Sequence, residues 1–67
     1  MLEFEVYRKR GKHWDLLYPS LRATDSRKAA LHASYVHSLK VIGVRPAGTN
    51  LKIFVTRLQH VATLTSA

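Results

Sequence analysis

Apolar and polar residues alternate twice near the start of the chain, on either side of a short basic segment that contains Gly11. The first alternation covers residues 2–7 and the second covers residues 13–18. A period of two is the pattern of a half-buried strand, and glycine readily adopts the positive φ of a tight turn. The sequence therefore predicts an antiparallel hairpin. Pro19 either ends its second strand or restricts that strand to an edge of the sheet.

Strict alternation also predicts which side chains of the hairpin share a face of the sheet. The two sets are Leu2, Phe4 and Val6 in the first strand, and Trp14, Leu16 and Tyr18 in the second. We expect Trp14 to belong to the core, because a small domain needs its largest side chain there.

A helix is predicted over residues 27–39, which are rich in alanine and contain neither glycine nor proline. It follows three residues, 24–26, of the types that cap helix N-termini. At 100° per residue, the larger apolar side chains fall on one arc of this helix. They are Leu31, Tyr35, Val36 and Leu39, with Ala29 and Ala33 beside them and Ser34 on the opposite side. We expect this arc to pack on the sheet.

The remainder of the sequence predicts one strand and contains one ambiguous segment. Residues 40–45 are short and β-branched, which favours a strand, and residues 46–50 have the composition of a turn. Residues 51–58 fit either a strand or part of a second helix, and we favour the strand because β-branched residues follow a turn. Residues 59–67 are expected to form a frayed tail.

The element order is thus β-β-α-β-β, with a second helix as the alternative for the last element. It predicts a single α+β domain over residues 1–58, in which one helix packs on one face of a small antiparallel sheet of three to four strands. The other face is left to water or to a partner.

Charge is the most unusual property of the composition. Eleven Lys and Arg residues face four Asp and Glu residues, which gives a net charge of +7, and no acid follows Asp25. A field of this sign attracts polyanions. The absence of cysteine excludes disulfides and thiolate zinc sites and fits a cytoplasmic location. No apolar run approaches the roughly 18 residues that cross a bilayer, so no membrane partner is expected.

Two groups of basic residues are candidates for binding nucleic acid or an acidic protein surface. Five lie at the predicted hairpin tip and two in the first turn of the helix: Arg8, Lys9, Arg10, Lys12 and His13, then Arg27 and Lys28. A two-stranded ribbon fits the major groove, its cations can neutralise phosphates, and nearby aromatic rings can stack on bases. A solvated turn has the same composition, and cations at a helix N-terminus are commonly tolerated without a bound anion.

Catalytic, metal and cofactor sites are not predicted. His32 and His37 project about 140° apart on a helix, and neither has a carboxylate three or four residues later. Acid–base catalysis needs two groups with opposed pKa values in a pocket, and so short a chain has little room for one. We expect a protein that is not an enzyme, with no catalytic residues, metal or cofactor.

Two functions therefore remain. The first is a small basic module that contacts nucleic-acid phosphates through its basic loops with little sequence specificity. The alternative is a protein-binding adaptor or inhibitor of the phage or mobile-element type, for example anti-CRISPR-like, that covers a surface of a larger nucleic-acid-handling complex.

Self-association is also predicted, because residues 51–58 carry apolar side chains on both faces and one helix covers only one face. Phe54, Leu58 and Leu17 are the candidate interface residues of a two-fold homodimer. A second helix over residues 51–64 would bury the same side chains within one chain, and a different protein could also cover them.

Overall fold

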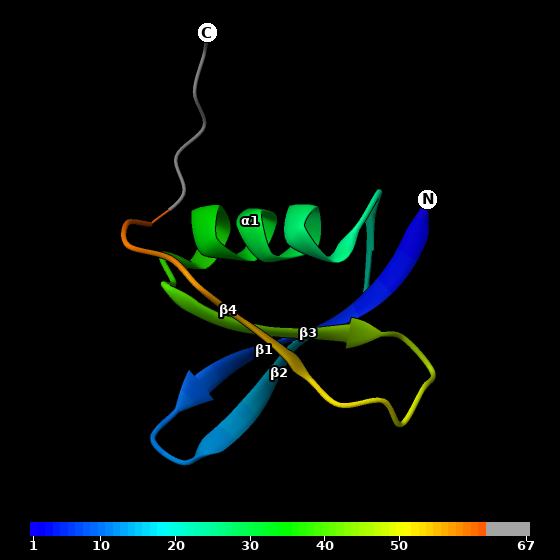
Figure 1. Ribbon diagram of the computed structural model, residues 1–67, viewed down its shortest axis with the longest axis horizontal. Coiled ribbons are helices and arrows are strands. Elements are labelled where there is room, and N and C mark those ends of the chain that lie inside the picture. The colour runs from blue at the N-terminus through cyan, green and yellow to red at the C-terminus, as the bar shows by residue number, and fades with distance from the viewer. Residues whose placement is uncertain (62–67) are drawn as a thin grey trace, which may run out of the picture.

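The computed structural model describes residues 1–61 as a four-stranded antiparallel sheet with one helix on one face (Figure 1). The elements are β1 (Leu2–Arg10), β2 (His13–Ala23), α1 (Ser26–His37), β3 (Val41–Pro46) and β4 (Phe54–Arg57). The strand order is β2-β1-β3-β4, so β1 and β3 are central and β2 and β4 form the edges. The predicted α+β fold and its element order are confirmed, with β4 a strand. The predicted tail lies outside the described residues from residue 62 onward.

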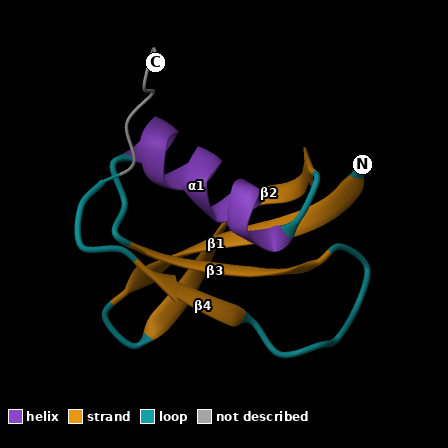
Figure 2. Ribbon diagram, turned by 45° about the horizontal axis from the view of Figure 1, so that its top comes forward, coloured by secondary structure: helices purple, strands orange, loops and turns teal. Residues whose placement is uncertain are grey.

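The hydrophobic core lies between α1 and the face of the sheet that it covers (Figure 2). The two central strands supply its larger side chains, which are Phe4, Val6, Ile42 and Val44. Val6 pairs with Val44 across β1 and β3, so these two side chains stand together at the centre of the layer. Ala29, Ala30 and Ala33 of α1 are buried against them.

The helix face predicted to pack on the sheet is right only in part, because Ala29 and Ala33 of that arc are buried but two of its larger side chains are not. Tyr35 and Val36 are 46% and 49% exposed, whereas Ala30 and Ser34 are fully buried. The sheet already fills the layer with large side chains, and a close-packed core leaves room only for small ones on the facing helix. Leu39, just beyond the helix, does pack against the core.

Both ends of α1 are capped by short polar residues. The Asp25 carboxylate accepts a hydrogen bond of 2.8 Å from the backbone N–H of Lys28, as an N-cap residue does. At the other end Ser38 adopts the left-handed conformation, with φ 55°. The buried Ser34 hydroxyl donates to the carbonyl of Leu39 over 2.6 Å. These contacts fix where the chain leaves the helix and enters β3.

Two irregularities in β2 divide the single face predicted for Trp14, Leu16 and Tyr18, whereas the alternation predicted for β1 is kept. The register passes from Phe4 opposite Leu21 to Val6 opposite Tyr18, and then to Tyr7 opposite Leu16. Each step inserts one extra residue in β2, as a β-bulge does, and each insertion shifts the alternation by one position. Trp14, Leu16 and Tyr18 therefore do not share a face. Tyr18 packs on the core, while Leu16 pairs with Tyr7 on the opposite face.

Pro19 lies within β2 at the first of these irregularities, and the strand continues to Ala23. Of the two outcomes predicted for Pro19, the edge position is confirmed and the end of the strand is wrong. An edge strand tolerates proline because a backbone N–H that faces solvent makes no hydrogen bond to another strand, so its absence costs the sheet nothing.

Candidate nucleic-acid interface

The face of the sheet opposite α1 carries aromatic and charged side chains, and we call it the open face. Residues that pair across an antiparallel ladder share a face, which assigns its members. It comprises Glu3, Glu5, Tyr7 and Lys9 of β1, Trp14, Leu16 and Arg22 of β2, Val41, Gly43 and Arg45 of β3, and Val55 and Arg57 of β4.

Trp14 lies across the open face and not in the core, so its predicted core position is wrong. Its ring extends from β2 over β1 to β3, where a β-carbon built on Gly43 would lie 3.0 Å from Cζ3. The same β-carbon would be closer still to Cγ2 of Ile53. Trp14 and Ile53 thus meet over a position that has no side chain. The Lys9 ammonium lies 4.8 Å from the centroid of the Trp14 ring, within the range of a cation–π contact.

A hydrogen-bonded network occupies the other end of the open face. The Glu5 carboxylate accepts bonds from the Tyr7 hydroxyl, from Arg45 Nε at 2.7 Å and from the Gly48 N–H at 3.2 Å. These bonds, led by that from Tyr7, lower the pKa of Glu5 from 4.5 to about 2. The same bond and burial raise the pKa of Tyr7. Arg45 Cζ also lies 5.4 Å from the Tyr7 ring centroid. This corner is neutralised internally.

Charge consequently changes sign along the open face of β1, from Glu3 and Glu5 at one end to Lys9 at the other. Arg57 pairs with Val41, which places it at the Lys9 end. The hairpin half, as we call this end, consists of Lys9, Lys12, Trp14, Leu16 and Arg57. A negatively charged ligand is favoured here, whereas at the Glu3 end two arginines, Arg22 and Arg45, balance the two carboxylates.

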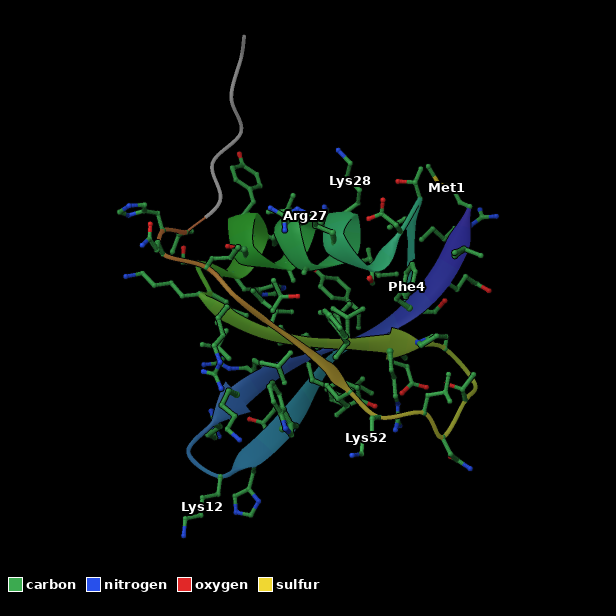
Figure 3. The ribbon with its side chains drawn as sticks, viewed as in Figure 1. Met1, Phe4, Lys12, Arg27, Lys28 and Lys52 are labelled. Atoms are coloured by element: carbon green, nitrogen blue, oxygen red, sulfur yellow. The ribbon has the colours of Figure 1, made fainter. Side chains whose placement is uncertain are left out.

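The predicted basic residues lie in two separate regions (Figure 3). Lys12 at the end of the hairpin is far from Arg27 and Lys28, which lie on α1 on the other side of the sheet. The seven candidates therefore do not form one surface. The turn itself consists of Gly11, with φ 58°, and Lys12, as the sequence predicts.

The cations of the hairpin tip also differ in their exposure and in whether they form an ion pair within the chain. Arg8 is on the helix side of β1, and its Nε is buried with no hydrogen-bond partner within residues 1–61. Arg10 Nε lies 3.2 Å from Asp15 Oδ2 in an exposed ion pair. Lys9, Lys12 and His13 are exposed. The lysines are therefore the cations of the tip that can reach a ligand without breaking an ion pair.

The three predicted interface residues do not form one patch. Phe54 is 68% exposed on β4, whereas Leu58 packs partly on the core and its N–H donates to the Lys40 carbonyl over 2.8 Å. Leu17 lies in β2, at the opposite edge of the sheet. Of the three, Phe54 presents the most exposed apolar surface.

Sequence reasoning missed one contact between histidine and tyrosine on the helix side. Tyr18 Oη lies 2.9 Å from His37 Nε2, and the His32 ring centroid is 6.0 Å from that of Tyr18. The β-bulge that turns Tyr18 toward the helix has no signal in the hydrophobic pattern. No group of three or more potential metal ligands gathers within the described part of the chain.

No family model, curated protein or solved structure matches this chain. The helix that the structure describes is too short and too polar to cross a membrane.

Proposed function

We propose that this protein is a small nucleic-acid-binding domain that contacts the phosphate backbone with the hairpin half of its open face. The supporting observation is that its four carboxylates are all engaged by groups of the same chain, while most of its cations are not paired within the described part of the chain. All four accept bonds or ion pairs inside the chain: Glu3 from Ser20, Glu5 from Tyr7 and Arg45, Asp15 with Arg10, and Asp25 at the helix cap. Of the eleven Lys and Arg side chains, nine form no ion pair within residues 1–61.

This excess positive charge is suited to a polyanion that carries closely spaced phosphates. Binding releases the counterions condensed on the nucleic acid, which is the main source of affinity for such contacts. Lys9 and Lys12 act as point charges on a strand turn, and phosphate contacts of this kind carry no sequence information. We therefore expect little sequence specificity.

The test compares two double variants by fluorescence anisotropy with a labelled oligonucleotide. Lys9→Gln with Lys12→Gln removes the hairpin cations, and Arg27→Gln with Lys28→Gln removes the same charge from the helix. We expect the first variant to bind about tenfold or more weakly and to reduce the salt slope by roughly one per lost phosphate contact. The helix variant should bind as the parent does.

Two results would contradict the proposal. One is the absence of binding by the parent protein at about 50 mM salt, where phosphate contacts are strong. The other is an equal loss in both double variants, which would mean that net charge and not the hairpin half determines affinity.

A protein-binding adaptor is the second candidate, and β4 is the observation that favours it. This edge strand is only four residues long, and Leu51 and Phe54 beside and within it are exposed. An unpaired strand edge with apolar side chains can add a strand from another protein. A partner captured from nuclease-treated lysate by the parent and lost with Phe54→Ser would support this function.

A further inference from the structure

We infer that the hairpin half selects single-stranded nucleic acid, because it stacks unpaired bases on Trp14 beside Lys9. This inference rests on the proposed function and adds to it the kind of nucleic acid that is bound. Phosphate contacts alone make no such distinction, so the inference depends on how the ring is held.

The Trp14 ring is positioned by the backbone and not by a deep pocket. The irregularity in β2 between Tyr18 and Leu16 sets the alternation that turns Trp14 toward the open face. Gly43 then leaves the space over β3 into which the ring extends, with Ile53 closing its far side. Trp14 is half-buried, so the ring is seated on the sheet while part of it stays accessible. A ring held in this way loses little conformational freedom when a base stacks on it.

Lys9 links the stacking surface to the phosphate contacts. Its ammonium lies 4.8 Å from the Trp14 ring centroid, and its side chain is exposed. A base can replace the ammonium on the ring, because both interact with the same π surface. The displaced ammonium remains within reach of the phosphate of that nucleotide, where it forms a stronger, charge-assisted contact.

Apolar side chains extend the surface on both sides of β1. Leu16 is 52% exposed and pairs with Tyr7, and Val55 is exposed opposite Gly43 on β4. Tyr7 and Trp14 are diagonal neighbours across β1 and β2, a separation of about 7–8 Å that long side chains can bridge. Duplex bases expose only their edges in the grooves, so a flat aromatic surface has nothing to stack on there. The other end of the open face offers no excess positive charge, because Glu5 is paired with Arg45 and Glu3 lies opposite Arg22, so we expect the phosphate contacts at the hairpin half.

The experiment uses the parent protein with three probes of about 12 nucleotides, a length within the range that one small binding fold covers. They are a single strand, the same strand in a duplex, and the same strand with abasic sites in place of its central nucleotides. Trp14 is the only tryptophan, so its emission reports on stacking directly. We expect the intact single strand to bind about tenfold or more tightly than the abasic strand and to quench the emission.

Variants then separate stacking from loss of folding. Trp14→Ala should remove the preference for the intact strand and leave duplex binding unchanged, and Trp14→Phe should retain part of it. Tyr35→Ala removes an exposed ring from the helix and serves as the matched control, with no change in binding. Equal affinity for the abasic and intact strands, or tighter binding of the duplex, would overturn the inference and leave the proposed function standing. Failure of all three probes to bind would overturn both.

Discussion

Trp14 packs against the backbone of Gly43, so closely that a β-carbon at residue 43 would lie 3.0 Å from its ring. Gly43→Ala should therefore push Trp14 and Ile53 away from β3 and destabilise the domain by about 1–3 kcal/mol, the usual cost of overpacking. Urea unfolding followed by tryptophan emission measures the loss, and the native emission should shift to longer wavelength.

Gly48→Ala is the matched control for that substitution. Gly48 has φ 76°, and a β-carbon there would meet nothing within 4 Å. We expect a loss of about 1–2 kcal/mol from backbone strain, with the native Trp14 emission unchanged. An unaltered emission spectrum in Gly43→Ala would show that the ring is not seated over this position.

Glu5 should make stability sensitive to acid. Its pKa is lowered from 4.5 to about 2 in the folded protein, so its ionised form favours folding. That contribution is fully present above about pH 4.5 and is lost as the pH falls through about 2. Glu5→Gln should lower Tm at neutral pH, and its Tm should approach that of the parent toward pH 2. A Tm difference that stays constant from pH 6 to about pH 2 would contradict the assignment.

The alanine face of α1 should tolerate little added volume. Ala33→Leu places a large side chain in the core that Ala33 shares with Val6 and Val44 and should cost about 1–3 kcal/mol or more by overpacking. Val36→Ala, on the exposed side, should change stability by less than about 0.5 kcal/mol. Chemical denaturation of both variants measures the two effects. A larger loss in Val36→Ala would restore the helix face predicted from the sequence.

Self-association remains a prediction, and Phe54 is now the residue that tests it best. Two copies of a chain with net charge +7 repel each other, so screening by salt should strengthen a dimer and weaken nucleic-acid binding. Sedimentation equilibrium should show a mass that rises with protein and salt concentration, and Phe54→Ser should abolish the rise. A parent protein that stays monomeric at high micromolar concentration contradicts the dimer.

The element order could be predicted from the sequence because the hairpin has a clear period of two and the helix has a cap, while the β-branched residues after a turn favoured a strand over a helix for β4. The orientation of Trp14 could not, because the extra residue in β2 lies where Leu16, Leu17 and Tyr18 are all apolar, and a run of apolar residues does not show which of them is out of register. The helix arc was displaced toward Tyr35 and Val36 for a different reason. The arc was defined by hydropathy, whereas close packing against the sheet requires small side chains such as those of Ala30 and Ser34, which are fully buried.

The candidate site was predicted in part. Lys9 and Lys12 belong to a continuous basic segment, residues 8–12, which is visible in the sequence itself. Arg45, Arg57 and Gly43 reach the same face through pairing between strands that are distant in the chain, as in the contact of Arg45 with Glu5. Local patterns contain no information on that register, so these three residues required the structure.

The ladder between β1 and β3 ends where Arg8 pairs with Ile42, while β1 and β2 remain paired to the turn. The last rungs of the hairpin therefore form a ribbon supported on one side only. Backbone amides there should exchange with solvent through small local openings, and those of Val6 and Val44 only through much larger ones. A ligand that binds the ribbon would suppress these small local openings and leave the larger ones unchanged. Deuterium uptake at Lys9 and Arg10 would then slow on binding while uptake at the centre of the sheet stayed the same.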